Sequence, residues 1–183
     1  KYRFRASVSG ALAYSDRTAL RYYPVQCWLD DDRVTPTEFP YLSGLEDEGA
    51  VVHVALRRDM NYIGETITLN GRAFDYGLTA CPPAHTRQSE VRFDLAPWPQ
   101  VTGLTATVGI DDAVGHRGSS VFVVEGRKAG IWHELFRSPR LTGKDDGLDI
   151  DVDGSGCDAL KLIATDGGDG IGADHAVWAD ARF

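Results

Sequence analysis

A glycine-rich acidic segment near the end of the chain carries residues suited to binding a cation. Asp166, Asp169 and Asp174 fall within nine residues, and four glycines lie between them. Such a segment can fold tightly, so that its carboxylates and free backbone carbonyls hold a hard cation such as calcium at about 2.3–2.6 Å. Ordinary turn structure explains the same composition, because Asp and Gly both favour tight turns. We expect calcium on this domain, with plain turns as the alternative.

A second acidic stretch matches the first half of a calcium-binding EF-hand loop. Asp149, Asp151 and Asp153 alternate along the chain and Gly154 follows them, as in that motif. Position twelve, however, is Leu160 instead of the bidentate Glu. The residues between the aspartates are apolar, so the pattern predicts a strand whose solvent face carries the three carboxylates.

No arrangement of residues in the sequence predicts catalysis. Asp111 and Asp112 invite comparison with the paired carboxylates of a glycoside hydrolase, but adjacent residues at a strand end point to opposite faces. Ser119, His116 and Asp174 could be combined into a triad, but the chain has no Gly-x-Ser-x-Gly segment to present the nucleophile. We therefore expect a domain that is not an enzyme.

The elements that must position these residues are short β-strands. Beyond residue 60, apolar and polar residues alternate almost throughout, and no long apolar run has helical spacing. Asn70-Gly71 tolerates positive φ and predicts a hairpin between segments 66–69 and 72–79. A turn is expected at Gly126-Arg127. Further strands are expected at 51–56, 89–95, 104–110, 120–125, 131–137, 148–153, 159–165 and 175–183. This pattern predicts an all-β fold, a jelly-roll β-sandwich of antiparallel strands.

The connections between these strands hold most of the polar and ionisable residues. If consecutive strands reverse direction, the connections that follow alternate strands emerge at the same end of the sandwich. The connections concerned are 57–65, 80–88, 111–118, 138–147 and 166–174. Because binding residues often lie on loops over a rigid β scaffold, we expect a binding site at this end.

The charge of the chain limits its partners. Lys and Arg number 19 against 27 Asp and Glu, which gives a net charge of -8. That sign opposes binding to nucleic-acid phosphates or to anionic membrane surfaces. No stretch approaches the ~18 apolar residues of a membrane-spanning helix. We expect neither a nucleic-acid partner nor insertion into a membrane.

The first 36 residues differ in pattern from the rest of the chain. Segments 1–8 and 19–29 predict two more strands in an N-terminal extension, and a linker leads to the module at 37–183. Because the chain opens on Lys1 without a secretion signal, we expect it to be a piece of a longer polypeptide. The three cysteines, Cys27, Cys81 and Cys157, allow at most one internal disulfide and leave the compartment open.

A distinctive motif closes the module: the stretch Asp174-His-Ala-Val-Trp-Ala-Asp-Ala-Arg-Phe183, which follows the loop Thr165-Asp-Gly-Gly-Asp-Gly170. This motif resembles the NPCBM family, the novel putative carbohydrate-binding module. Further matches occur in the same order at Tyr41–Leu45, Leu69–Leu78 and Ala106–Asp112. The resemblance covers about residues 41–183.

This resemblance implies a jelly-roll module that is not catalytic and is secreted as part of a carbohydrate-active protein such as a glycoside hydrolase. A structural calcium and a galactose-type ligand are implied as well. Asp112 and Asp180 lie in matched motifs and join the acidic loop as candidate cation ligands, although Asp112 could serve loop architecture and Asp180 a buried Arg. The candidate metal ligands are therefore Asp112, Asp169, Asp174 and Asp180.

Strand alternation predicts the faces of the matched final strand. Trp178 is expected to pack in the core and to share its face with Asp180. The other face is expected to hold His175, Val177, Ala179, Ala181 and Phe183.

Two departures from the family pattern bear on the ligand. Cys81 stands where the family usually has His, and His53 stands where it usually has Trp. A thiol cannot replace the two-sided hydrogen bonding of imidazole, and loss of an indole removes a stacking platform. The departures put the family's usual sugar in question.

The leading hypothesis is a sugar-binding module for a galactose-type or related glycan. Carboxylate and guanidinium groups can hold neighbouring hydroxyls, while Tyr or His meets the apolar C–H face of the sugar. The high proportion of Arg among the cations leaves room for an anionic sugar. The alternative is a spacer domain that has lost its ligand and packs on a catalytic partner. Candidate contacts are Arg58, Asp59, Tyr62, His85, His116 and Arg117.

Overall fold

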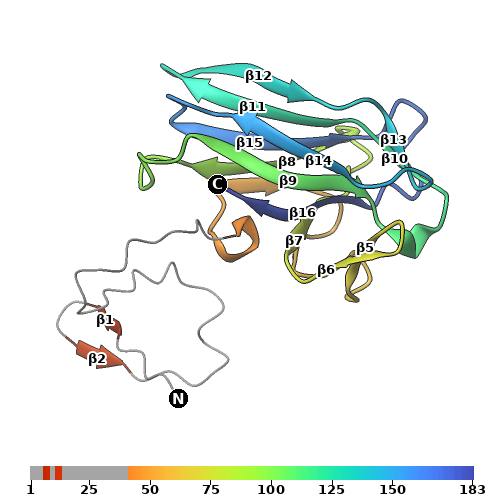
Figure 1. Ribbon diagram of the computed structural model, residues 1–183, viewed down its shortest axis with the longest axis horizontal. Coiled ribbons are helices and arrows are strands. Elements are labelled where there is room, and N and C mark those ends of the chain that lie inside the picture. The colour runs from red at the N-terminus through yellow and green to blue at the C-terminus, as the bar shows by residue number, and fades with distance from the viewer. Residues whose placement is uncertain (1–5, 9–10, 14–40) are drawn as a thin grey trace.

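The computed structural model describes residues 6–8, 11–13 and 41–183, and residues 41–183 form an antiparallel β-sandwich (Figure 1). One five-stranded sheet has the order β12 (Ile131–Arg137), β11 (Phe122–Lys128), β15 (Ala159–Thr165), β8 (Gln88–Asp94) and β3 (Gly49–Val51). The other has the order β14 (Leu148–Asp153), β9 (Gly103–Ile110), β16 (Ala176–Arg182), β7 (Gly77–Thr79) and β4 (Arg57–Arg58). From β8 onward the chain crosses repeatedly between the sheets, and the predicted all-β jelly-roll sandwich is confirmed.

The main core lies between the two sheets and is filled by the alternating apolar residues that the sequence marks. Phe93, Leu104, Phe122 and Trp178 are each at most 1% exposed. The Trp178 ring meets Phe122 edge-on, with centroids 5.3 Å apart and planes at 84°. Such edge-to-face pairs add stability beyond the burial of apolar area. The prediction that Trp178 is a packing residue is confirmed.

The predicted hairpin is present and covers the outer face of the second sheet. Its second strand, expected at 72–79, ends at Phe74, and Gly77–Thr79 belongs to the second sheet as β7. β5 (Ile67–Leu69) pairs with β6 (Arg72–Phe74) around Asn70 and Gly71, whose φ values of 45° and 81° fit the primed turn of a tight hairpin. Its apolar side chains form a second, smaller core with Val177 and Ala179 of β16.

Smaller elements complete the described structure. β10 (Ser119–Ser120) pairs with β13 (Leu141–Thr142), and two 3-10 turns span Leu42–Gly44 and Asp112–Val114. In the N-terminal extension, β1 (Ala6–Val8) pairs with β2 (Ala11–Ala13). The predicted strand at 1–8 thus overlaps β1, whereas the strand predicted at 19–29 lies outside the described residues. Within the described ranges, no helix is long and apolar enough to cross a membrane.

The aspartate ladder of the EF-hand-like stretch lies on β14, as strand alternation predicts. Asp149, Asp151 and Asp153 are exposed, whereas Ile150 and Val152 are buried in the core. The three carboxylates therefore line the solvent face of an amphipathic strand.

The prediction of a turn at Gly126-Arg127 is wrong. β11 runs through Gly126 to Lys128, and the turn lies at Ala129-Gly130, with φ values of 50° and 79°. Gly126 is needed inside the strand because a Cβ there would lie 2.7 Å from the Leu135 side chain. A glycine can therefore mark a close packing contact as well as a turn.

The face assignment of the final strand is wrong beyond Ala179. The register of β16 against β9 shifts between Ala179 and Arg182, and Asp180 has a left-handed φ of 47°. This bulge rotates the strand, so that Ala181 and Phe183 join the main core on the side of Trp178. Ala179 stays in the smaller core under the hairpin.

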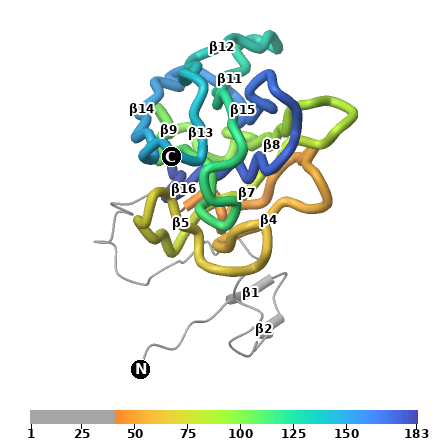
Figure 2. Tube along the Cα trace, turned by 90° about the vertical axis from the view of Figure 1, so that its right-hand side faces the viewer, coloured from red at the N-terminus to blue at the C-terminus, as the bar shows by residue number. Residues whose placement is uncertain are grey.

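The polar connections gather at one end of the sandwich, which we call the loop pole and which faces the viewer in Figure 2. The ends of β9 and β7 lie beside the start of β16, because Ile110 pairs with Ala176 and Thr79 with Val177. In the other sheet, the end of β15 lies beside the start of β8 and the end of β12 beside the start of β11. This register confirms the prediction for the connections 80–88, 111–118, 138–147 and 166–174. The connection predicted at 57–65 differs, because β4 begins at this pole, where Arg57 pairs with Thr79, and runs away from it.

One boundary at the loop pole differs from the prediction. The strand expected at 51–56 ends at Val51, and the segment 52–56 is a loop of the pole between β3 and β4. The backbone turns sharply there, because the Ala55 N–H donates to the His53 carbonyl at 2.9 Å.

The opposite end of the sandwich holds both ends of the module. Tyr41 forms an antiparallel bridge with Arg182, whose guanidinium lies 5.7 Å from the centre of the Tyr41 ring. The other face of that ring stacks on Tyr76, with centroids 4.1 Å apart.

Candidate functional site

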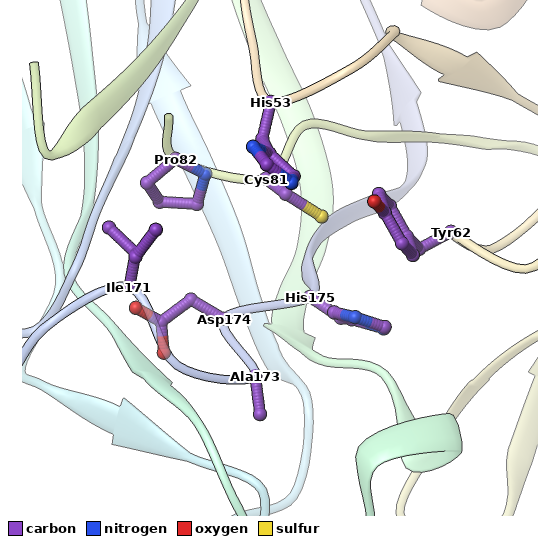
Figure 3. A pocket seen from close by; sticks show the side chains of 8 residues that line it. All are labelled: His53, Tyr62, Cys81, Pro82, Ile171, Ala173, Asp174 and His175. Carbon is purple, nitrogen blue, oxygen red and sulfur yellow. The ribbon is translucent and has the colours of Figure 1, made fainter. Parts of the chain in front are cut away.

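The loop pole contains a small pocket built from four connections (Figure 3). Its volume is about 140 Å³, below the roughly 300–1,000 Å³ of drug-sized ligand sites. The β3–β4, β4–β5, β7–β8 and β15–β16 connections supply its walls. The lining residues are His53, Tyr62, Cys81, Pro82, Ile171, Ala173, Asp174 and His175. A pocket of this size suits one small ring or group.

His53 is held at the rim by a strained turn. The hydrogen bond from Ala55 to His53 closes a three-residue turn around Val54, whose φ is 65°. A positive φ is costly for a β-branched residue, and turns of this kind are rare and strained. The His53 N–H donates to the Cys81 carbonyl at 2.8 Å, which fixes the turn to the pocket wall. Strain of this type is concentrated at binding and catalytic sites.

Tyr62 stands between the two histidine rings of the pocket. Its ring centre lies 4.7 Å from His175 and 6.1 Å from His53. Asn61 sets this position, because its side chain donates to Asp111 at 3.1 Å and accepts from the Glu65 N–H at 2.9 Å. The three rings offer apolar faces together with polar edges, a combination that suits both the C–H face and the hydroxyls of a sugar.

Cys81 forms an inert part of the wall, and in Figure 3 its side chain lies between His53 above and His175 below. Its side chain is 6% exposed, and burial raises the pKa of the thiol to about 12. The nearby charges of Asp174 and Asp111 act in the same direction. The thiol therefore stays protonated near neutral pH and is no nucleophile.

Asp174 is the charged group of the pocket. It is 1% exposed, and its Oδ1 accepts the Ser119 N–H at 2.8 Å. Its other oxygen, Oδ2, is buried and finds no hydrogen-bond partner within the described part of the chain. Burial raises the pKa of this carboxyl to about 6, and the charges of Asp169 and Asp166 add to the rise. At neutral pH Asp174 is therefore a carboxylate with one unused acceptor.

His175 supplies a neutral ring beside Tyr62. Burial lowers the pKa of its imidazole, so the ring is uncharged at neutral pH. Its Nδ1 is also buried and, among residues 41–183, has no hydrogen-bond partner. Strand alternation predicted this side chain on the face of Val177, but His175 precedes β16 and lines the pocket instead.

The other acids of the glycine-rich loop are held by arginines. Arg87 pairs with Asp166 at 2.5 Å, and Arg140 pairs with Asp169. Asp169 also accepts the Ser119 hydroxyl at 2.9 Å. Although burial opposes it, the Gly168 N–H and Arg87 lower the pKa of Asp166. Two guanidinium groups thus neutralise the loop from outside the pocket.

The four predicted metal ligands do not form one site. The Asp112 carboxylate caps the hairpin turn, accepting the N–H groups of Asn70 and Gly71 at 2.8 Å each. Asp180 lies in the bulge of β16, and Asp169 is paired with Arg140. Across the residues that the structure describes, no three His, Cys, Asp or Glu side chains come together to hold a metal. These side chains do not fit a carboxylate-rich calcium site.

Of the predicted sugar contacts, Tyr62 lines the pocket. Arg58 instead fastens the start of the module: its guanidinium donates to the Leu42, Ser43 and Leu45 carbonyls at 3.1, 3.0 and 2.7 Å and pairs with Asp47 at 2.7 Å. This engagement leaves Arg58 pointing away from the pocket.

The remaining predicted contacts do not line the pocket. Asp59 adopts a left-handed φ of 56° and accepts the Gly77 N–H at 3.2 Å. His85 is exposed on the β7–β8 connection. His116 Nδ1 lies 3.2 Å from the Gly143 carbonyl, and Arg117 donates to the Val114 carbonyl at 3.2 Å. The structure therefore brings one of the six into the pocket.

Four pocket residues with side chains able to hydrogen-bond were not among the predicted sugar contacts: His53, Cys81, Asp174 and His175. The signals for them were present in the sequence. His53 and Cys81 are the two departures from the family pattern, and Asp174 and His175 open its C-terminal motif. The structure shows that the departures and the C-terminal motif line the same cavity.

A β-sandwich with a small, aromatic and polar pocket among its end loops has the features of a carbohydrate-binding module. The chain belongs to the NPCBM family: the sequence model described as NPCBM/NEW2 domain matches residues 40–183. A comparison with curated proteins finds no match.

Solved structures of carbohydrate-binding modules share this fold. CBM51 from Clostridium perfringens GH95, solved in complex with methyl-galactose, is 30% identical, with a TM-score of 0.68 over 78% of this chain and 97% of that chain. CBM51-2 with the INT domains of Clostridium perfringens ZmpB is 23% identical, with a TM-score of 0.67 over 78% of this chain and 30% of that chain. A chain with the M60 catalytic domain and both CBM51 modules of ZmpB is 24% identical, with a TM-score of 0.64 over 78% of this chain and 15% of that chain. The last two likenesses support the fold alone.

Proposed function

We propose that this module binds a galactose-type or related glycan and holds its terminal sugar in the pocket of the loop pole. The observation that carries the proposal is the grouping of three rings, His53, Tyr62 and His175, around one small cavity. Their faces can pack on sugar C–H groups, and their polar edges can exchange hydrogen bonds with hydroxyls. The methyl-galactose bound to the GH95 module supports the class of ligand.

The size of the pocket favours the end of a glycan over its interior. A cavity of about 140 Å³ admits one ring, and further sugars must lie outside it. Few contacts per ligand mean weak binding by a single module, and useful attachment then comes from several modules acting together.

The module serves a secreted carbohydrate-active protein in this proposal. CBM51 modules occur beside an M60 catalytic domain in ZmpB, and we propose the same kind of arrangement for this module. The module would then keep that neighbour close to glycan-bearing surfaces and take no part in its chemistry.

Calorimetry with matched histidine variants tests the proposal. Titration of methyl galactoside should give saturable binding, and His53→Ala and Tyr62→Ala should each weaken it at least about tenfold, the effect of losing a central contact. His85→Ala, on the same pole but outside the pocket, is the control and should change it less than twofold. Equal losses in His85→Ala and His53→Ala would place the sugar outside this pocket.

A spacer role is the second candidate function, and the presence of Cys81 in the pocket wall favours it. A buried, protonated thiol offers a sugar much less than an imidazole does. If no saccharide on a glycan array binds, and deletion of the module destabilises the protein that carries it, the spacer role replaces sugar binding.

A further inference from the structure

The free oxygen of Asp174 is the feature of the pocket that most constrains its ligand. The side chain is 1% exposed, Oδ1 is occupied by the Ser119 N–H, and Oδ2 lacks a partner in the described structure. A buried acceptor left without a donor costs free energy, more so when it is charged. A ligand that brings a donor to Oδ2 removes that cost, whereas one that brings an acceptor increases it.

The charges around the pocket do not supply the missing donor. No Lys or Arg belongs to the part of the pocket wall that the structure describes. Arg87 and Arg140, on neighbouring connections, are paired with Asp166 and Asp169. Arg117, whose charge acts on His175, donates to the Val114 carbonyl. The other polar lining groups are neutral: the imidazoles of His53 and His175, the Tyr62 hydroxyl and the Cys81 thiol. The described pocket lining thus includes one buried carboxylate and no cation of its own.

We propose that Asp174 accepts a hydrogen bond from the bound sugar and makes the pocket select sugars by charge. This inference rests on the proposed sugar-binding function. Amine-bearing sugars bind most tightly, because an ammonium forms a charge-assisted bond with the carboxylate. Neutral sugars bind through a hydroxyl donor. Acidic sugars are rejected, since a second carboxylate or a sulfate would meet Asp174 with the same charge and without a donor. The anionic sugar that the Arg content left open is therefore excluded from this pocket.

The wild-type protein tests this ranking without any variant. Calorimetric titrations at pH 7 with methyl galactoside, its 2-amino-2-deoxy analogue and the methyl glycoside of galacturonic acid compare sugars of one ring type. The amine should bind at least threefold more tightly than the neutral sugar, and the acid at least tenfold more weakly. Equal affinities, or tighter binding of the acid, would overturn the proposal.

Asp174→Asn identifies the residue responsible. An Asn carbonyl can still accept the Ser119 N–H, while its amide turns the free acceptor into a donor. Binding of the neutral and amine-bearing sugars should fall at least tenfold, and the acid should no longer be the weakest ligand. Asp151→Asn, an exposed residue of β14, makes the same change in net charge and should keep the wild-type ranking.

The outcomes separate this inference from the proposed function. If the wild type binds none of the three sugars, both fall. If all three bind equally and Tyr62→Ala abolishes binding, the pocket is a sugar site and only the role of Asp174 is overturned. A folded Asp174→Asn variant with wild-type affinities likewise overturns the role of Asp174 and leaves the sugar site standing.

Discussion

Two hollows of similar size on this module differ in how their polar groups are satisfied. The pocket of the loop pole has a volume of about 140 Å³, and a second hollow beside the β5–β6 hairpin has about 150 Å³. In the second, Arg72 lies 4.5 Å over the Phe74 ring, Asn70 bonds to Asp146, and Thr107 donates to Asp149 at 2.6 Å. Its charged and amide groups hold one another and leave little for a ligand. The two hollows therefore do not differ in volume, but they differ in how many of their polar groups have partners.

Two buried aspartates differ in the same way, in how many of their carboxylate oxygens have hydrogen-bond partners. Asp111, 0% exposed, accepts the Thr68 N–H at 3.0 Å, the Asn61 amide at 3.1 Å and the Ala113 N–H at 3.0 Å. Asp174 uses one oxygen and leaves the other free. Asp111 ties the hairpin to the loop pole, so we assign it a structural role. The half-used carboxylate is the one that lines a pocket.

The largest expected effect follows from disturbing the satisfied aspartate. Asp111→Asn should lower the free energy of unfolding by about 2–4 kcal/mol, because the new amide must face a buried donor that the carboxylate accepted. Urea unfolding measures the loss, and Asp151→Asn on the surface should stay within about 0.5 kcal/mol of wild type. If Asp111→Asn loses little free energy of unfolding, the proposed difference between the carboxylates of Asp111 and Asp174 is wrong.

The half-satisfied aspartate should respond with the opposite sign. Its pKa is raised from 3.8 to about 6, so the folded state disfavours the carboxylate at pH 7. The rise from 3.8 to about 6 corresponds to about 3 kcal/mol at pH 7, and the buried Asn amide, which lacks an acceptor, offsets about 1–2 kcal/mol of it. Asp174→Asn should therefore stabilise the fold by about 1–2 kcal/mol at pH 7. The gain should shrink as pH falls through about 6, where wild-type Asp174 takes up a proton, and should be lost by 3.8. Unfolding midpoints of both proteins between pH 4 and 7 give the comparison; a destabilised variant at pH 7 contradicts it.

A substitution in the second hollow, beside the β5–β6 hairpin, should have little effect on sugar binding. Arg72→Ala removes the contact with Phe74 and a 3.8 Å pair with Asp149, and both Arg72 and Asp149 are exposed. We expect a loss of about 0.5–1 kcal/mol in stability, typical of exposed cation–π and ion pairs. Affinity for methyl galactoside should be unchanged by calorimetry. Weaker sugar binding in Arg72→Ala would make the second hollow part of the site.

Removal of calcium is expected to have the smallest effect. Since arginines hold Asp166 and Asp169, and Asp112 and Asp180 lie apart from them, EDTA should lower the melting temperature by less than about 2 °C. A specific ion would instead add stability that chelation removes. A fall of several degrees, restored by added calcium, would recover the calcium prediction, with Asp174 Oδ2 as the free carboxylate oxygen.

The sequence predicted the sandwich because period-2 alternation and turn residues act locally. The Asn70-Gly71 turn, the exposed face of β14 and the grouping of loops at one pole all followed from such rules. The errors occurred where tertiary contacts override local pattern. Gly126 lies inside a strand because neighbouring side chains fill its place, and the bulge at Asp180 reverses the faces of β16.

The site was harder to predict because residue type does not reveal which polar groups are already used. Arg58 has ideal chemistry for a sugar hydroxyl, yet three carbonyls and Asp47 occupy it. His53 reaches the pocket through a strained turn at Val54, which no propensity rule expects for a β-branched residue. Tyr62 was found from its chemistry, and its neighbours became visible only through the fold.

The bridge between Tyr41 and Arg182 defines the axis along which the module would carry a pulling force. Both its ends lie together at the end of the sandwich remote from the pocket (Figure 1). A polypeptide joined at either end and a glycan held at the other would pull along the length of the strands. Under such tension the interstrand bonds resist in shear, many at once, instead of peeling apart one after another. A module that binds a surface weakly would benefit from that geometry, because the glycan would dissociate before the sandwich unfolds.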